Sequence, residues 1–301
     1  ANKDGTLTRA EAQAYRAKLQ AEQPNRNNPN RNNQNAERST PTHADVSYGP
    51  HERNVLNLYL AENDKPTPLL IYIHGGGFVG GNKNTVSPQV IAACNEAGVS
   101  LAALHYRFVT TPIRVNAEKY ILDPARFAAY GGSAGAGISM WLAFKDDMAQ
   151  PDAEDPLLRQ STRLVAVGTT GGQTSYDPNV IKAWIGGRAH EHPSIYKCYG
   201  IERLEQMADP ELQPLYDEVS AIKHLTKDDP PIYMIYSEAD APLPEDARPG
   251  QGIHHPIFGH KLKAEMDKLG IENHYHHTSE GSRARGEGMA EWLIGKLQKD
   301  E

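Results

Sequence analysis

The chain has 301 residues, of which 39% are hydrophobic and 23% charged, and its net charge is −7 with histidine counted as neutral. A chain of this length can bury a sizeable core, and its length fits one large α/β domain as well as two small domains. The acidic balance, without a basic cluster, argues against a nucleic-acid partner, and no apolar run approaches the roughly 20 residues that span a bilayer. The two cysteines, Cys94 and Cys198, are too few for a disulfide framework.

The first residues resemble a cut-off EF-hand. The pattern of its calcium loop matches from the second ligand position onward, at Asn2, Asp4, Gly5 and Glu11. The leading aspartate is missing, so residues 1–22 are expected to form a truncated EF-hand-like helical segment without useful calcium affinity. The alternative is a plain helix start, with Thr8 and Glu11 as a capping box. Because calcium is plentiful outside cells, this start favours a secreted or periplasmic protein whose leader has been removed.

Residues 23–42 are rich in asparagine, proline and arginine and almost free of apolar side chains. Such a stretch cannot bury enough surface to offset the entropy lost on ordering it. It is therefore predicted to be an Asn-rich linker that precedes the main domain, residues 43–301.

Within the main domain, apolar runs alternate with helical patterns. Strand-like runs lie at 69–74, 99–106, 127–131, 164–170, 231–237 and 271–277. Helix-like segments lie near 87–97, 134–146, 256–269 and 286–298. Buried strands that alternate with helices predict an α/β fold, with a mostly parallel central sheet and helices on both faces.

A G-x-S-x-G motif follows one predicted strand and opens a predicted helix. It reads Gly-Gly-Ser-Ala-Gly, with Ser133 at its centre. The glycines permit a sharp strand-to-helix turn, which lifts the serine hydroxyl above the edge of the sheet, where a nucleophile is needed. The same motif arises by chance in about one chain of this length in ten, so it does not decide the function alone.

A second motif, His74 followed by three glycines, ends the strand-like run at 69–74. Glycines at the carboxyl end of a strand let bare backbone N–H groups point into a cleft, where they can hold a developing oxyanion. A merely tight turn explains one or two glycines in this place, but not three after a histidine. The two motifs together indicate nucleophilic acyl transfer.

On these motifs the sequence resembles the hormone-sensitive-lipase-like branch of the α/β-hydrolases, and the small bacterial esterases that act on carbohydrate esters. The resemblance covers roughly residues 44 to 298 and rests on HGGGFVGG (74–81), YGGSAGAG (130–137) and DDPPIYMIYSEADAPLP (228–244). It implies that Ser133 is the nucleophile. It further implies that the oxyanion donors are Gly76, Gly77 and Ala134, and that the histidine of the HGGG motif orders the loop rather than acting as the base.

The resemblance places the acid of the catalytic triad just after a late strand. Asp240 occupies that place, and its neighbour Glu238 is the alternative. A solvated turn carboxylate is the competing interpretation of Asp240, but its position after the strand favours the acid.

The base histidine is missing from its expected place. In the family it lies in the loop after the last strand, and here that loop, residues 278–288, contains no histidine. His277 ends the last strand, three strands from the nucleophile strand, and at about 4.8 Å per strand the gap of about 14 Å is too wide for its side chain. The Gly/Pro-rich stretch 247–256 has the slack to cross the cleft, which makes His255, or else His254, the better stand-in. The pair could instead anchor the helix that follows.

A stand-in base competes with two alternatives. One is that segments are absent from the 301-residue chain, because the connection 107–126 is also short for a parallel crossover. The second is a true loss of the base, with Arg283 or Arg285 filling its place, which leaves a protein that binds but barely turns over. We rank absent segments first, loss of the base second and a stand-in third.

The sequence therefore predicts a serine carboxylesterase that hydrolyses small or carbohydrate-linked esters through an acyl-enzyme, with Ser133, His255 and Asp240 as its triad. The alternative is a catalytically impaired or dead hydrolase-fold binding protein, and amidase activity is not distinguished. No metal or organic cofactor is required. The expected partner is a small-molecule ester, and the oligomeric state is left open. The segment GGQTSYDP, residues 171–178, either lines the cleft or forms a simple turn.

Overall fold

The computed structural model of the chain describes residues 40–49, 51–78, 80–105, 120–156, 158–280 and 287–298. All of them belong to one compact unit, Ser39–Glu301. The EF-hand-like interpretation of residues 1–22 lies outside the described residues, and so does the predicted linker up to residue 39.

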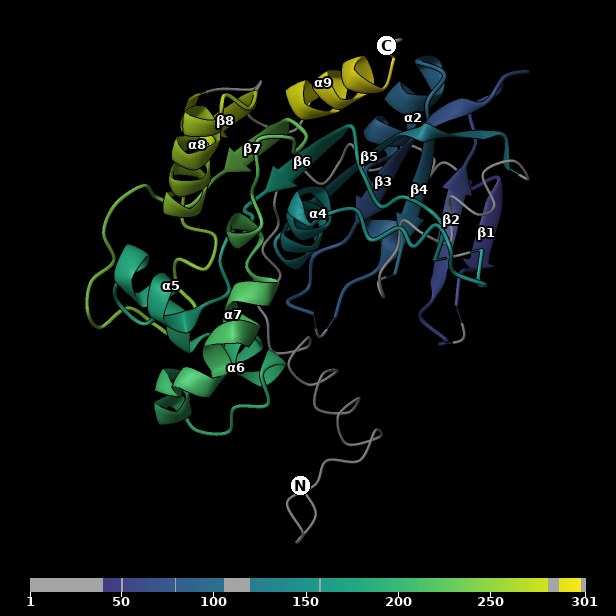
Figure 1. Cartoon of the computed structure of the whole chain (residues 1–301). Helices are drawn as coiled ribbons and strands as arrows, with labels where there is room; N and C mark the ends of the chain where they lie inside the picture. Colours follow the sequence, from purple (N-terminus) through teal and green to yellow (C-terminus); the bar gives the residue numbers. More distant parts are fainter. Residues whose placement is uncertain are drawn as a thin grey trace, which may run out of the picture. The chain divides into compact units, whose positions relative to one another are not determined.

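An eight-stranded sheet forms the centre of this unit (Figure 1). The strands are β1 (His43–Ser47), β2 (Val55–Tyr59), β3 (Thr67–Ile73), β4 (Ser100–Leu104), β5 (Leu122–Gly132), β6 (Ala166–Thr170), β7 (Ile232–Tyr236) and β8 (Asn273–His277). Their order in space is β1-β2-β4-β3-β5-β6-β7-β8. The pairs β1–β2 and β2–β4 are antiparallel, and all the strands from β4 to β8 in that order are parallel. The carboxyl ends of the parallel strands therefore share one edge, where ligands bind in sheets of this kind.

The longer helices are α2 (Pro88–Glu96), α4 (Ala134–Phe144), α8 (Ile257–Leu269) and α9 (Glu287–Leu297), and the shorter ones are α5 (Pro178–Ile185), α6 (Pro193–Cys198) and α7 (Gln213–Val219). Short 3-10 helices are η2 (Lys83–Thr85), η4 (Ala189–Glu191), η5 (Leu204–Ala208), η6 (Pro210–Leu212), η7 (Ala221–Lys223) and η8 (Thr278–Glu280). None of the helices that the structure describes is long and apolar enough to cross a membrane.

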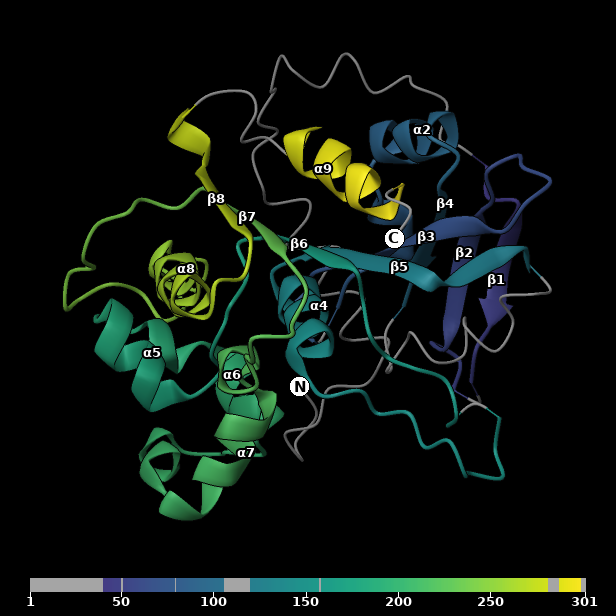
Figure 2. The same cartoon turned by 45° about the horizontal axis from the view of Figure 1, so that its top comes forward.

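Helices cover both faces of the sheet (Figure 2). On one face α2 and α9 contribute Cys94 and Leu293 to an apolar cluster. On the opposite face α4 and α8 contribute Phe144 and Phe258 to a second cluster. Along β3, side chains alternate between the two clusters, as the period of a strand requires. The central strands are therefore buried from both sides, and strands such as β4 and β7 read as continuous apolar runs.

The predicted α/β fold class, with its mostly parallel sheet and helices on both faces, is confirmed. Each predicted strand and helix overlaps an observed one. The sequence predicted neither β1, which is largely exposed and carries no apolar run, nor β2, a strand of five residues that Asn57 interrupts. It also missed α5, α6 and α7, because helices of eight, six and seven residues are too short to show a clear apolar period.

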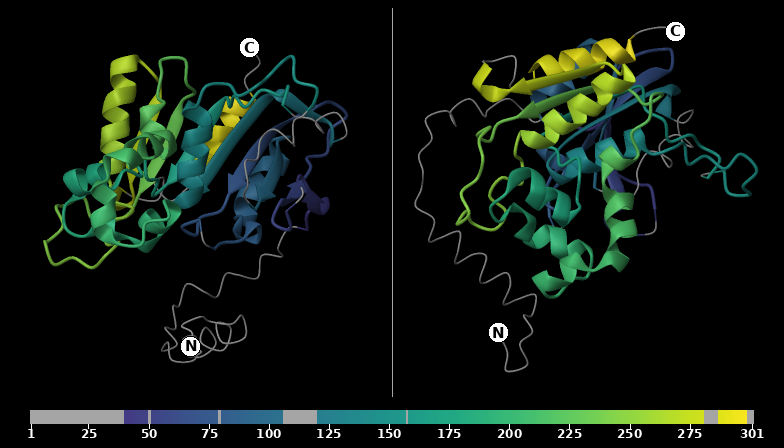
Figure 3. Two further views of the ribbon diagram at one scale, coloured as in Figure 1. Left: turned by 60° about the horizontal axis from the view of Figure 1, so that its bottom comes forward. Right: turned by 60° about the vertical axis from the view of Figure 1, so that its left-hand side comes forward.

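The three short helices lie in the long connection between β6 and β7. Figures 1 and 3 show them grouped together. α5 begins at Pro178 behind Asp177, whose carboxylate accepts hydrogen bonds from the N–H groups of Asn179 and Val180. Proline at the first helical position and aspartate at the cap are both typical helix starts, so this segment is built from standard local signals.

Candidate active site

Ser133 stands at the turn between β5 and α4. The strand ends at Gly132 and the helix begins at Ala134. Ser133 has φ 51° and ψ −122°, a conformation that residues with a side chain rarely adopt and that nucleophile turns use. The turn is tight, because a Cβ on Gly135 would lie 2.1 Å from the carbonyl oxygen of Ile73. The G-x-S-x-G motif thus forms the strand-to-helix turn that its glycines predicted.

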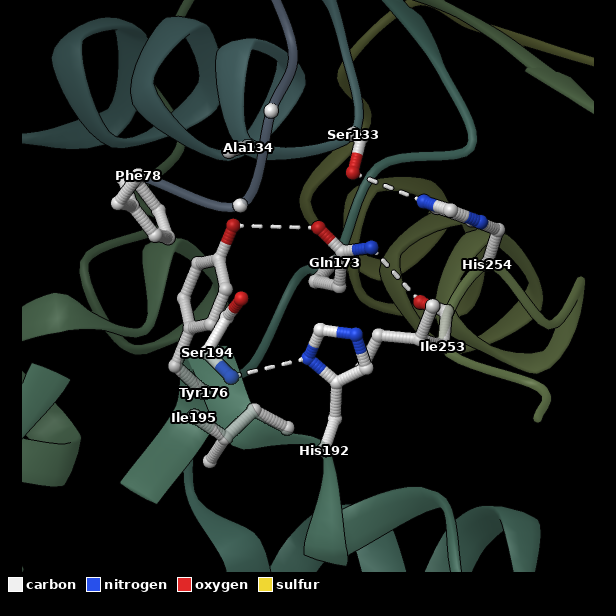
Figure 4. A pocket seen from close by; sticks show the side chains of 12 residues that line it. Phe78, Ser133, Ala134, Gln173, Tyr176, His192, Ser194, Ile195, Ile253 and His254 are labelled. Atoms are coloured by element: carbon white, nitrogen blue, oxygen red, sulfur yellow. Dashed lines mark hydrogen bonds between the residues drawn. The ribbon is translucent and has the colours of Figure 1, made fainter. Parts of the chain in front are cut away.

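His254 faces Ser133. Its Nε2 lies 2.8 Å from Oγ of Ser133 (Figure 4). His254 belongs to the stretch 237–256 between β7 and α8, which contains neither helix nor strand. The slack that the sequence indicated in this stretch is what brings a histidine to the serine.

His255, which the sequence favoured as the partner of Ser133, points elsewhere and is 6% exposed. Its Nδ1 accepts a hydrogen bond from the N–H of Ile257 at 3.0 Å, so Nε2 carries the proton and donates it to the carbonyl oxygen of Ala241 at 3.0 Å. Both histidines lie in the turn that begins at Gly252, where the N–H of His255 bonds to the carbonyl oxygen of Gly252 at 2.9 Å, and their rings find different partners. The expected contact of His255 with Ser133 is therefore corrected: His255 anchors the start of α8, and the residue before it makes the contact.

The carboxylate beside His254 is Glu238 rather than Asp240. Oε1 of Glu238 lies 3.3 Å from Nδ1 of His254, and each side chain is about a third exposed. The distance is long for a hydrogen bond, as is common at catalytic sites without substrate. Asp240 instead pairs with Nε2 of His260 on α8 at 2.7 Å. The contact expected of Asp240 is thus corrected to the residue that the sequence held as its alternative.

The end of β8 supports the backbone of Glu238. Nε2 of His277 donates to the carbonyl oxygen of Glu238 at 2.8 Å. β8 lies three strands from β5 in the sheet, the separation on which His277 was excluded as the base. In the loop that follows, residues 281–286 lie outside the described residues, and these include Arg283 and Arg285. Whether an arginine fills the usual place of the base therefore stays a prediction.

The glycine loop after β3 lines the same pocket as Ser133. Gly76 and Gly77 have φ of 128° and 58°. A Cβ on Gly76 would lie 2.1 Å from the carbonyl oxygen of Gly80, so only glycine fits this turn. Both glycines line the pocket together with Ala134, the first residue of α4. N–H groups in the first turn of a helix have no partner within that helix. The structure thus gathers the three predicted oxyanion donors around one serine.

His74 fixes the start of this glycine loop. Its Nδ1–H donates to the carbonyl oxygen of Gly75 at 2.7 Å, and its Nε2 lies 3.2 Å from Nδ1 of His105. Burial lowers the pKa of both imidazoles, and the nearby guanidinium of Arg53 lowers them further. His105 has a pKa of about 4. Both rings are therefore neutral near pH 7, which matches the loop-ordering role that the resemblance implied for His74.

This pair predicts a loss of stability in acid. In the unfolded chain His105 takes up a proton near pH 6.5, and in the folded chain only near pH 4, so the unfolded state binds more protons between these values. The contribution of His105 to stability is therefore complete above about pH 6.5 and is lost as the pH falls to about 4. Thermal unfolding at pH 7 and pH 4.5 measures this loss. We expect His105→Gln to reduce the difference in Tm between the two pH values, and equal differences in both proteins would contradict the assignment.

Ser133 and His254 line a pocket of about 270 Å³ (Figure 4). The other lining residues are Gly76, Gly77, Phe78, Ala134, Gln173, Tyr176, His192, Ser194, Ile195 and Ile253. Nδ1 of His192 accepts a hydrogen bond from the N–H of Ser194 at 3.1 Å, so its Nε2 carries the proton. Burial lowers the pKa of His192, and the neighbouring His254 contributes to the shift. His192 is thus a neutral donor that adds no charge beside His254.

The segment 171–178 lines this pocket through Gln173 and Tyr176, and so does more than form a simple turn. The residues that follow in the same connection were not foreseen at all. His192 directly follows η4 and Ser194 lies in α6, and no motif marks either residue. Only their place in the chain could have indicated them. The connection starts after Thr170, the last residue of β6, whose carbonyl oxygen accepts a hydrogen bond from the N–H of Ser133 at 2.9 Å.

A pocket lined by two histidines raises the question of a metal ion. Over the described ranges, no group of three or more histidine, cysteine, aspartate or glutamate side chains is arranged to hold one. The pocket offers the hydroxyls of Ser133, Ser194 and Tyr176 and two imidazoles, and the carboxylate of Glu238 lies behind one of those imidazoles, that of His254.

The family model described as BD-FAE matches residues 56–247, which is more than half of the chain. The chain belongs to the BD-FAE family. The match includes the glycine loop, Ser133 and Glu238, and it ends before His254. His254, which contacts Ser133, therefore lies outside the residues of this BD-FAE chain that match the family model.

Known proteins are similar to this chain at low identity. The probable carboxylic ester hydrolase LipM of Mycobacterium tuberculosis is 24% identical over 221 residues, which are 66% of this chain and 48% of that protein. The chain thus spans about half the length of that relative.

Solved structures show the same fold. A truncated form of a carbohydrate esterase from gut microbiota has a TM-score of 0.62 at 18% identity, covering 88% of this chain and 99% of that one. An acetyl ester-xyloside bifunctional hydrolase from Caldicellulosiruptor lactoaceticus has a TM-score of 0.55 at 19% identity, covering 80% and 87%. The predicted α/β-hydrolase fold is confirmed.

Proposed function

We propose that this protein is a serine carboxylesterase for small or carbohydrate-linked esters, with Ser133, His254 and Glu238 as its triad. The observation that carries the proposal is the 2.8 Å contact between Oγ of Ser133 and Nε2 of His254. A serine hydroxyl is a weak nucleophile unless a base lies within hydrogen-bond reach. Both residues line one pocket with the glycine loop, so the nucleophile, the base and the donors surround a common space.

In the first half of the reaction, Oγ of Ser133 attacks the ester carbonyl and its proton passes to Nε2 of His254. Glu238, on the far side of the ring, stabilises the imidazolium and holds the tautomer in which Nε2 is free to accept. The backbone N–H groups of Gly76, Gly77 and Ala134 hold the oxyanion of the tetrahedral intermediate. The imidazolium then gives its proton to the departing alcohol as the carbon–oxygen bond breaks, which leaves an acyl group on Ser133.

In the second half, water attacks the acyl-enzyme. His254 takes a proton from the water, the second tetrahedral intermediate forms at the same backbone donors, and the acid leaves as the proton returns to Oγ of Ser133. Every proton taken by His254 is thus given back within the same turnover.

The pocket suits a small substrate with both apolar and polar parts, because Phe78, Ile195 and Ile253 line it beside its polar groups. Its volume of about 270 Å³ lies just below the range of roughly 300–1,000 Å³ that is usual for ligand sites. Tyr176, His192 and Ser194 bring hydroxyl and imidazole groups to its wall, and such groups suit the hydroxyls of a sugar. The names of two similar structures, a carbohydrate esterase and an acetyl ester-xyloside hydrolase, agree with this substrate class.

The test is release of acetate from p-nitrophenyl acetate and from an acetylated xyloside by the purified protein. Turnover of both supports the full proposal, and turnover of the first alone restricts it to small esters. Release from neither substrate, above the rate of Ser133→Ala, would favour the alternative of a catalytically dead binding protein. The Ser133–His254 contact argues against that alternative, because a dead site has no need to keep a base on its serine.

The two neighbouring carboxylates give a matched pair of variants. We expect Glu238→Gln to lower kcat about 10³- to 10⁴-fold, because the amide no longer stabilises the imidazolium and favours the wrong tautomer. Asp240→Asn removes a surface carboxylate paired with His260, and such pairs contribute little, so its kcat should stay within about threefold of the parent. Steady-state kinetics with p-nitrophenyl acetate measures both. A larger loss in Asp240→Asn than in Glu238→Gln would reverse the assignment of the acid.

A further inference from the structure

A base on a loop needs a support, and His254 lies on a stretch without helix or strand. Catalytic groups must be held within about 0.5 Å of the productive geometry, usually by packing and by hydrogen bonds from a rigid element. The residues around His254 show what supplies this support. They come from the first turn after β6, in the segment 171–178.

Gln173 ties the backbone next to His254 to this segment (Figure 4). Its Nε2 donates to the carbonyl oxygen of Ile253 at 2.7 Å and lies 3.3 Å from the carbonyl oxygen of Gly171. Its Oε1 accepts from the hydroxyl of Tyr176 at 3.2 Å. The side chain is 3% exposed. Carbonyl acceptors on one end of the amide and a hydroxyl donor on the other fix which end carries nitrogen.

Gly171 forms the wall against which the imidazole packs. Its φ is 56°, and a Cβ at this position would lie 3.2 Å from Cβ of His254 and 3.3 Å from two of its ring atoms. The N–H of Gly171 bonds to the carbonyl oxygen of Ile235 in β7 at 2.8 Å. The wall is therefore part of the sheet edge. A side chain at this position would crowd the ring by a few tenths of an ångström and would be strained at this positive φ.

We propose that Gln173 is the positioning residue of the base: it clamps Ile253 and so holds His254 against Gly171, on Ser133. The proposal rests on the proposed function, since it assigns a support to the base of that triad. The GGQTSYDP segment, residues 171–178, would thus support the stretch that carries the base, which in this protein lies before α8 and not after β8. Gln173 acts through His254 rather than on the reacting atoms.

Gln173→Met tests the clamp, because methionine keeps the length of the side chain and removes both donors. We expect kcat for p-nitrophenyl acetate to fall about 10²-fold, since a displacement of about 1 Å in a reacting group costs that much, while KM stays within about threefold. The matched control is Gln213→Met. Gln213 donates to Asp177 and to Asp217 at 3.0 Å each within the same β6–β7 connection. Its loss should leave kcat within about threefold.

A double variant separates positioning from contact with the substrate. In His254→Ala supplied with imidazole, the clamp has no base to hold, so adding Gln173→Met should change the imidazole-dependent rate by less than about twofold. A further large loss would mean that Gln173 binds the substrate directly, and it would overturn the proposal. A normal kcat in Gln173→Met, with Ser133→Ala inactive, would overturn the clamp and leave the esterase intact. Parent protein no faster than Ser133→Ala would overturn both.

Discussion

Ser133→Ala is expected to lower kcat for p-nitrophenyl acetate by about 10⁶-fold, to the level that the backbone donors and binding alone sustain. The reason is that no covalent intermediate can form without Oγ, which lies 2.8 Å from its base in the parent protein. The fold should be retained, because alanine removes only one oxygen at a turn that the surrounding glycines shape. Burst and steady-state kinetics with the ester, together with thermal unfolding, measure both effects.

Ser139→Ala is the control for this change. Ser139 is buried in α4, and its hydroxyl donates to the carbonyl oxygen of Gly135 one helical turn earlier at 2.8 Å. Its loss should leave kcat within about threefold, because hydrogen bonds of this kind within a helix contribute little. If Ser133→Ala kept a tenth of the parent activity, Ser133 would not be the nucleophile.

His254→Ala is expected to lower kcat by a similar factor of about 10⁶, because the serine and its base act as one unit. Without this imidazole, Oγ of Ser133 loses the base that lies 2.8 Å away, and a serine hydroxyl without its base is a weak nucleophile. The KM should change little, since a base contributes mainly in the transition state. The measurement is steady-state hydrolysis of p-nitrophenyl acetate at a pH where the parent is fully active.

His260→Ala is the control for the histidine change. His260 is a half-exposed imidazole paired with a carboxylate close to the same loop, and it has no contact with Ser133 in the described structure. Its removal should leave kcat within about threefold, as for other exposed ion pairs. A loss in His260→Ala comparable with that in His254→Ala would point to loop stability, rather than base catalysis, as the cause.

The sheet and its larger helices could be predicted because each leaves a long local signal. β3 and β7 are unbroken apolar runs buried on both faces. α8 combines a helical pattern with a glycine stop at Gly270, which has φ 73°. The placement of Ser133 could be predicted for the same reason, since the glycines needed for the turn are neighbours in the sequence.

The choice between His254 and His255 could not be predicted, because both share one loop and one chemistry. Which ring faces the serine depends on the turn at Gly252 and on the partners that draw His255 toward α8. The same holds for Glu238 and Asp240, which differ only in whether the irregular chain after β7 aims them at His254 or at His260. Tertiary contacts decide how these side chains are oriented, and such contacts produce no periodic pattern of apolar residues in the sequence.

The contact between Gln173 and Ile253 in the pocket wall could not be predicted either. Gln173 lies 80 residues before Ile253, yet its amide meets that carbonyl. A polar side chain in a short loop reads as a turn residue until the distant segment is in place. The contact between Ser133 and His254 also joins segments that are distant in the sequence. For this reason the sequence ranks the stand-in histidine third, although it is the alternative that the observed contacts support.

The proposed mechanism depends most directly on His254 being the base for Ser133. The decisive measurement is the rate of p-nitrophenyl acetate hydrolysis by His254→Gly and His255→Gly, each with and without added imidazole, after subtraction of the rate of Ser133→Ala with imidazole. We predict that His254→Gly is inactive alone and regains activity when imidazole fills the space of the lost ring. The activity of His255→Gly, whatever level its folded fraction sustains, should not change when imidazole is added. Restoration of His255→Gly by imidazole, with His254→Gly still active on its own, would contradict this mechanism.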